Sequence, residues 1–214
     1  MRAALAITLG ALAKPFAVLV LPAIWRPWDW RMPCLVAVVI AICYMPYLSV
    51  GARVFGFLTT GYLNEEFLDS GNIIWPLAVW RLVFGAHRGD VVVYLFATAI
   101  ILSVLALIAA HREPRSPQSI LADITRLLLA FLLLLSPSYP WYFLAIVPFV
   151  ALRGGATVWT ASIGALLLQN ELDWDYYIPL LVRKSILYGG VLAAFAYSIW
   201  WDRRSPTGAN GQWP

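Results

Sequence analysis

The sequence predicts an all-α fold, a multi-pass transmembrane helical bundle with about five to seven membrane helices. The 214 residues are 62% hydrophobic and only 12% charged, and their mean hydropathy is +0.77. Several apolar runs reach the length of about 18 residues that a membrane-spanning helix needs. A soluble domain of this size would need more charge to cover its surface, so we exclude that class. The formal charge of +4 is assigned to loops that face lipid headgroups and not to nucleic acid.

The first apolar run is expected to form one helix from Ala3 to Trp25. Cleavage after the signal-peptide-like Ala11-Leu12-Ala13 would leave a remainder too short to span a membrane. The second run covers Met32 to Val50 and contains the cysteines Cys34 and Cys43. On a helix these cysteines lie about 13 Å apart along the axis, so we predict no disulfide between them.

Gly51 to Gly89 has a different character, because charged residues are spread among Phe, Trp and Leu. This pattern favours amphipathic helices that lie on the membrane surface or plug a cavity. Asp90 to Ala110 is a clean third span, and a fourth helix follows from Pro117 to Leu135. Asp123 and Arg126 lie three residues apart near the start of that helix, where they can pair.

The stretch Ser136-Pro137-Ser138-Tyr139-Pro140-Trp141-Tyr142 then interrupts the apolar pattern. Irregular backbone at membrane depth is tolerated where it lines a wet cavity walled by protein, so this stretch is the first candidate for a site. Tyr139 to Leu152 and Ala156 to Gln169 are each too short to cross a hydrocarbon core of ~30 Å as helices. They either cross in part or form a re-entrant hairpin. Ile178 to Trp201 is the last predicted helix.

We therefore expect one helical transmembrane domain over residues 1–202 and a disordered polar tail over residues 203–214, on the cytoplasmic side. Arginines gather in the short connections of one face, which the positive-inside rule makes cytoplasmic. The opposite, extracytoplasmic face receives the Gly51 to Gly89 segment, the Ser136 to Tyr142 break and the acidic Glu171 to Asp175. The predicted location is the cytoplasmic (inner) membrane, with the site on its outer side.

Two groups of residues could carry chemistry on that side. The acidic group is Glu65, Glu66 and Asp69, which could face a sugar hydroxyl, hold a divalent cation, or form a solvated acidic face. The cationic group is Lys14, Arg183 and Lys184. A cation at membrane depth costs roughly 2.5 to 3.5 kcal/mol on insertion scales, so a lipid phosphate is an expected partner. Snorkelling to the interface, or for Lys14 a salt bridge, is the alternative.

Three short segments of the sequence resemble a known family. Lys14-Pro15, the Tyr62 to Phe67 stretch, and above all Ser136 to Tyr142 with Val147-Pro148-Phe149 resemble the C-terminal half of GT-C superfamily glycosyltransferases. The branch that looks most similar is the bacterial polyprenyl-phosphate-mannose-dependent mannosyltransferases. Where this chain has Tyr139, members of that family commonly have His.

The resemblance implies an enzyme that passes a sugar from a polyprenyl phosphate to a lipid or glycan acceptor outside the cytoplasmic membrane. The family's acidic catalytic residue lies in a first external loop that would precede Met1. We therefore expect this chain to be the C-terminal half of a larger fold, inactive alone, with Glu65, Glu66 and Asp69 as the catalytic candidates it retains. The expected substrate-binding residues are Lys14, Ser138, Tyr139, Trp141, Tyr142, Arg183 and Lys184.

Two other classes stay open. Proline-broken helices and the intramembrane Lys14, Asp123 and Arg126 are also typical of a transporter or channel fragment, although no internal repeat is found in the sequence. The third reading is a non-catalytic membrane assembly subunit.

Overall fold

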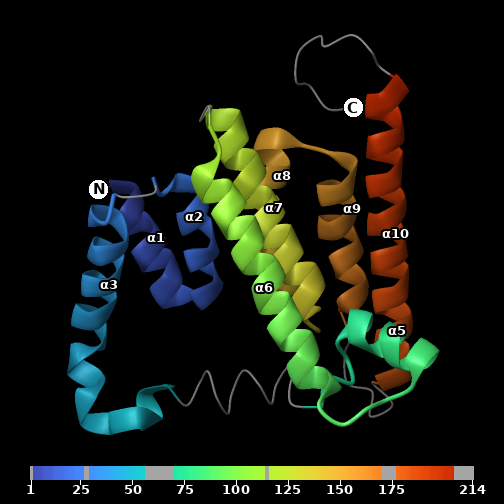
Figure 1. Cartoon of the computed structure of the whole chain (residues 1–214), viewed down its shortest axis with the longest axis horizontal. Coiled ribbons are helices and arrows are strands. Elements are labelled where there is room, and N and C mark those ends of the chain that lie inside the picture. Colours follow the sequence, from blue (N-terminus) through green and yellow to red (C-terminus); the bar gives the residue numbers. More distant parts are fainter. Residues whose placement is uncertain (1, 27–28, 56–69, 114–115, 170–176, 205–214) are drawn as a thin grey trace. The chain divides into compact units, whose positions relative to one another are not determined.

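A computed structural model describes residues 2–26, 29–55, 70–113, 116–169 and 177–204 (Figure 1). Every regular element within these ranges is a helix, which confirms the all-α prediction. The α-helices are α1 (Arg2–Ala13), α2 (Leu21–Ile24), α3 (Arg31–Tyr44), α5 (Trp75–Phe84), α6 (Asp90–His111), α7 (Pro117–Leu135), α8 (Val147–Arg153), α9 (Ala156–Gly164) and α10 (Tyr177–Arg204). The 3₁₀ helices are η1 (Pro15–Val20), η2 (Met45–Phe55), η4 (Pro140–Ala145) and η5 (Ala165–Leu168).

Three of the described helices are long and apolar enough to cross a membrane: α6, α7 and the Leu180–Trp201 part of α10. These correspond to three of the five long apolar runs from which membrane helices are predicted. The other apolar helices in the described ranges are shorter. The number of spans predicted from the sequence, about five to seven, is therefore not reached by these helices.

The chain forms two compact units, Met1–Glu65 with Leu95–Leu128, and Glu66–Tyr94 with Leu129–Pro214. In the first unit α1 packs on α3 and on η1 (Figure 1). In the second unit α9 and α10 form the most extensive helix pair, and α5 crosses the N-terminal part of α10. The single helical domain predicted for residues 1–202 stays a prediction.

The prediction of one continuous helix from Ala3 to Trp25 is wrong. The backbone of Lys14 is extended, with φ −145° and ψ 115°, and it separates α1 from η1. The cause is Pro15, because the residue before a proline is driven out of the helical region. With only 12 residues, α1 is about 18 Å long, too short to cross a bilayer by itself.

Two predicted boundaries near the C-terminus also change. The stretch from Tyr139 to Leu152 is a 3₁₀ helix, η4, followed by the short α8, and not one helix. α10 continues to Arg204, so the tail predicted from Arg203 begins too early. Arginines in the last turn suit the negative end of the helix dipole, which explains the extension. Residues 205–214 lie outside the described residues.

Close packing of α9 on α10 depends on Gly164. A Cβ atom at this position would lie 2.6 Å from Cδ1 of Leu187, which is buried, whereas a Cβ atom at Gly189 would meet nothing within 4 Å. Gly164→Ala is expected to lower the free energy of unfolding by about 1–3 kcal/mol through overpacking. The matched Gly189→Ala is expected to raise it by up to ~1 kcal/mol through helix propensity. Denaturation in mixed micelles measures both, and shifts of the same sign would contradict this packing.

Candidate functional site

The break after α7 leaves main-chain carbonyls without their usual donors. In an α-helix the carbonyl of residue i accepts the N–H of residue i+4. Pro137 and Pro140 have no N–H, so the carbonyls of Leu133 and Ser136 lose this donor. Ser136 is the one described non-glycine residue with a positive φ, 51°, and it turns the chain out of the helix.

Within the second unit, side chains of α10 supply both missing donors, and α6 adds a bond to the carbonyl between them in sequence, that of Leu134. Tyr188 of α10 donates its hydroxyl to the carbonyl of Leu133. Lys184, one turn earlier on α10, donates its ammonium to the carbonyl of Ser136. Tyr94 of α6 donates to the carbonyl of Leu134 over 2.7 Å. We call Tyr94, Lys184 and Tyr188 the carbonyl clamp.

Lys184 has the most unusual environment of the three. Its side chain is 0% exposed, and its Nζ also donates to the carbonyl of Ile73 over 2.8 Å. A buried ammonium is costly unless it is hydrogen-bonded. The end of α7 offers the carbonyl of Ser136 as an acceptor, and its helix dipole places partial negative charge there. Lys184 therefore joins three segments that are distant in the sequence: the Ile73 turn, the Ser136 break and α10.

Trp75, the first residue of α5, strengthens this junction. Its main-chain N–H donates to Oγ of Ser136 over 3.1 Å, and its indole N–H donates to Oγ of Ser185 over 2.8 Å. Its ring stacks on that of Tyr188, with 4.3 Å between centroids and 18° between planes. The hydroxyl and the carbonyl of Ser136 thus both accept from groups outside its own helix.

The other predicted substrate-binding residues of the break divide into a buried and an outward-facing set. Ser138 and Tyr142 are buried. The rings of Tyr139 and Trp141 stack with centroids 4.2 Å apart and planes 11° apart, and Trp141 is 48% exposed. This pair forms an aromatic surface at the start of η4, of the kind on which a sugar ring or a prenyl chain can pack.

The remaining predicted cations lie in different places. Arg183 is half-buried and donates from Nη1 to the carbonyl of Gln169 over 3.0 Å. Lys14 belongs to the first unit, where it is exposed at the turn between α1 and η1, with its Nζ 5.8 Å from the centre of the Phe16 ring. The expectation that Lys14 lies in the middle of one continuous helix is therefore wrong, because Pro15 drives Lys14 out of the helical conformation.

Carboxylates are placed only in part. Glu65, Glu66 and Asp69, and the acidic residues 171–175, lie outside the described residues. Asp123 is buried in the first unit and pairs with Arg126 over 3.0 Å, as the spacing predicts, and with Arg112 over 3.3 Å. Among the residues that the structure describes, no group of three His, Cys, Asp or Glu side chains could hold a metal ion.

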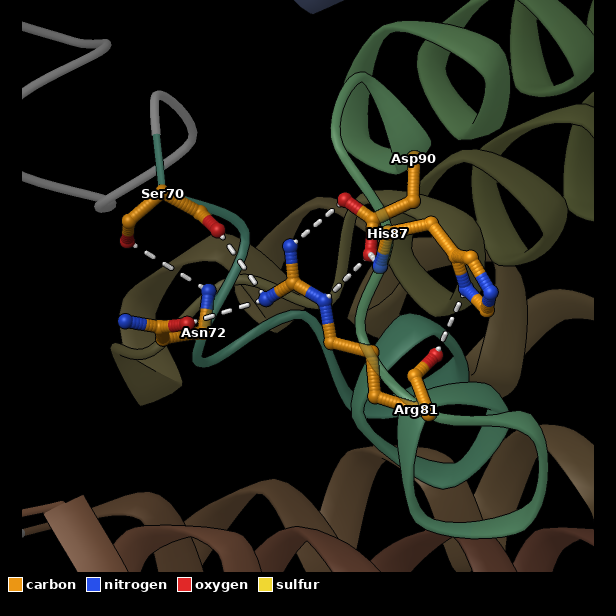
Figure 2. A network of polar contacts seen from close by, with 6 residues as sticks. Ser70, Asn72, Arg81, His87 and Asp90 are labelled. Carbon is orange, nitrogen blue, oxygen red and sulfur yellow. Dashed lines mark hydrogen bonds and ion pairs between the residues drawn. The ribbon is translucent and has the colours of Figure 1, made fainter.

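A second polar network lies between α5 and α6 in the second unit (Figure 2). The guanidinium of Arg81 makes a bidentate pair with Asp90, from Nε to Oδ2 and from Nη2 to Oδ1, each over 2.7 Å. Its Nη1 donates to the carbonyl of Ser70 over 3.0 Å and to Oδ1 of Asn72 over 2.9 Å. The main-chain N–H of His87 donates to Asp90 over 3.4 Å.

The sequence analysis does not identify Trp75, Tyr94 and Tyr188, and it names Ser136 only as part of the break. One signal could have found part of this set. Pro137 and Pro140 remove two specific donors, so the sequence implies that carbonyls 133 and 136 need partners. It does not say which tyrosine or lysine supplies them.

Comparisons with known protein families, with curated proteins and with solved structures find no match to this chain.

Proposed function

We propose that this chain is the membrane-embedded part of a GT-C glycosyltransferase. The enzyme transfers a sugar, mannose by the resemblance, from a polyprenyl phosphate to a lipid or glycan acceptor on the outer side of the cytoplasmic membrane. One observation carries the proposal: the non-helical backbone from Ser136 to Tyr139, which leads into η4, is anchored by the buried Lys184 and presents a stacked Tyr139–Trp141 pair. The predicted bundle of about five to seven membrane helices would surround it.

Anchored irregular backbone is what a binding wall at membrane depth requires. Non-helical chain is tolerated there only when its polar groups are satisfied by protein or water. The carbonyl clamp satisfies the carbonyls of Leu133 and Leu134 at the end of α7 and that of Ser136 at the start of the break. The half-exposed Trp141 is then held at a fixed position beside them, which suits stacking on a sugar ring.

The reaction would be an inverting displacement. The acceptor hydroxyl oxygen attacks the anomeric carbon, the bond from that carbon to the phosphate oxygen breaks, and the hydroxyl proton goes to a carboxylate. The leaving lipid phosphate is an anion and needs a cation, for which Arg183 is the candidate in the second unit, whereas phosphate binding by Lys14 stays a prediction. A guanidinium has five N–H donors, so the bond from Arg183 to Gln169 does not exhaust it.

The sequence predicts that Lys184 binds the phosphate of the substrate, but this proposal gives it a positioning role instead. Because its ammonium donates to the carbonyls of Ile73 and Ser136, it acts as a positioning residue for the wall of the site. Glu65, Glu66 and Asp69 stay the candidates of this chain for the base, and a divalent cation stays an open cofactor.

The same observation on Lys184 also favours a second candidate function, a non-catalytic membrane assembly subunit. A buried cation that is engaged with main-chain carbonyls can stabilise a helical packing without taking part in any reaction. The two functions differ in one measurable property, sugar transfer.

Transfer is tested in membranes that contain the full-length protein, supplied with a labelled polyprenyl-phosphate sugar. The proposal expects label in an acceptor product. Trp141→Ala is expected to raise KM about three- to tenfold, the equivalent of one lost stacking contact. The matched control is Trp159→Ala on α9, since Trp159 is 50% exposed and Trp141 48%. Absence of transfer would support the assembly subunit. An equal change of KM in Trp141→Ala and Trp159→Ala would mean that the break does not belong to the substrate-binding site.

A further inference from the structure

The outer surface of α5 is apolar over most of its second half. Val79, Trp80, Leu82, Val83 and Phe84 are 37 to 85% exposed, with Leu82 the most exposed. Only the opposite face is covered, where Leu77 packs in a small core with Ile74, Val91 and Tyr94. An apolar surface of this kind in water marks a place where something else binds.

Arg81 would be expected to keep this part of α5 in water, because it lies in the middle of the apolar residues. Its charge is instead neutralised by the bidentate pair with Asp90, and its Nη1 also donates to the carbonyl of Ser70 and to Oδ1 of Asn72 (Figure 2). The side chains of Arg81 and Asp90 are only 18% and 10% exposed. The exposed face of α5 therefore carries no outward-pointing arginine.

The position of α5 along the chain tells which environment covers that face. α5 ends at Phe84, and α6, a helix able to span a membrane, begins at Asp90. Gly85 and Gly89 have φ of 82° and 83°, a conformation that glycine adopts without cost, so the chain reverses within this short connection. Val92 and Val93 in the first turn of α6 are 70% and 69% exposed and would contact lipid. α5 is thus held beside the level at which α6 enters the bilayer.

We propose that α5 is an interfacial helix whose exposed apolar face is inserted into the lipid bilayer, and that the Arg81–Asp90 pair makes this insertion possible. With 10 residues, α5 is about 15 Å long and cannot span, so it lies in the plane of the interface. Trp80 and Phe84, with ring centroids 4.1 Å apart, are residues typical of the apolar face of an interfacial helix. This inference does not depend on the proposed sugar transfer.

The depth of α5 is measured with nitroxide labels on single cysteines in the full-length protein, after replacement of Cys34 and Cys43 by Ala. The protein is placed in vesicles of phosphatidylcholine and phosphatidylglycerol. Labels at Leu82→Cys and at Val83→Cys are compared with a label at His87→Cys, an exposed polar position in the α5–α6 connection. Leu82 and Val83 lie outside the core, so either variant is expected to fold.

Collisions with a water-soluble nickel complex are expected to be about tenfold rarer at positions 82 and 83 than at 87, because polar solutes are excluded from hydrocarbon. Collisions with oxygen are expected to be more frequent there. Nickel access equal to that at 87 would overturn insertion. Exclusion of both reagents would overturn it too, since a protein surface would then cover α5.

The ion pair is tested with the label kept at Val83→Cys. Asp90→Asn leaves the Arg81 charge without its carboxylate and is expected to raise nickel collisions several-fold. The charge-swapped double variant Arg81→Asp with Asp90→Arg is expected to restore the low value. Asp29→Asn, in the first unit, is the control and should change nothing. Unchanged nickel access in Asp90→Asn would show that the ion pair does not contribute to insertion. Insertion itself is decided by the comparison of the labels at 82 and 83 with the label at 87.

Discussion

Replacing Lys184 with methionine is expected to lower the free energy of unfolding by about 2–4 kcal/mol, because each buried carbonyl left without a donor costs roughly 1–3 kcal/mol. The two carbonyls concerned are those of Ile73 and Ser136, which both accept from the ammonium. Methionine keeps the length and most of the volume of lysine, so a packing defect contributes little. Loss of the cost of burying a charge offsets part of the effect.

Arg183→Met is the matched control, because it removes a neighbouring cation of similar length from a half-buried position. Its one described bond goes to the carbonyl of Gln169, and we expect a loss of about 1 kcal/mol or less. Denaturation of the purified protein in mixed micelles, followed by tryptophan fluorescence, measures both variants. If Lys184→Met were no less stable than Arg183→Met, the carbonyl clamp would not stabilise the fold.

The parts of the fold that the sequence predicts well are those with one dominant physical signal. α6 and α7 begin and end within a residue of their predicted limits, because a long apolar run bounded by charge or proline has few alternatives. α10 is found for the same reason, although its predicted end is short. The pair of Asp123 with Arg126 follows from helical spacing alone.

Predictions fail where a short-range rule competes with hydropathy. The run from Ala3 to Trp25 is apolar enough for one span, but Pro15 forces Lys14 into an extended conformation and divides it. Hydropathy does not detect this effect, whereas the restriction on the residue before a proline does. Lys14 therefore does not lie within a continuous helix, as the apolar run alone predicts, but at the turn between α1 and η1.

The candidate site is only half visible in the sequence. Lys184 is conspicuous because a cation in an apolar helix needs a partner, and the break from Ser136 to Tyr142 is conspicuous because of its prolines. Their direct connection joins residues 48 positions apart, and the bond from Lys184 to Ile73 joins residues 111 apart. Such long-range pairs depend on how the helices pack, which no local pattern specifies.

Ser136→Val is expected to lower the free energy of unfolding by about 1–3 kcal/mol, for two separable reasons. Ser136 has φ of 51°, a conformation that costs an ordinary residue such as serine roughly 1–2 kcal/mol and a β-branched one more, so valine adds only the excess over serine. Valine also lacks the oxygen that accepts the N–H of Trp75 over 3.1 Å, and an unpaired donor there costs about 1–2 kcal/mol.

Ser136→Gly separates these two contributions. Glycine adopts a positive φ without strain, so the relief of strain and the loss of the hydroxyl oppose each other, and stability should stay within about 1 kcal/mol of the unchanged protein. Ser136→Ala is expected to lie between the glycine and valine variants, since it loses the hydroxyl and keeps a Cβ atom. The order Gly, Ala, Val, measured in the same micelle denaturation, tests the turn at Ser136 independently of Lys184. Equal stability of the valine and glycine variants would mean that the chain does not turn through a positive φ at this residue, and the anchoring of the break would then need another explanation.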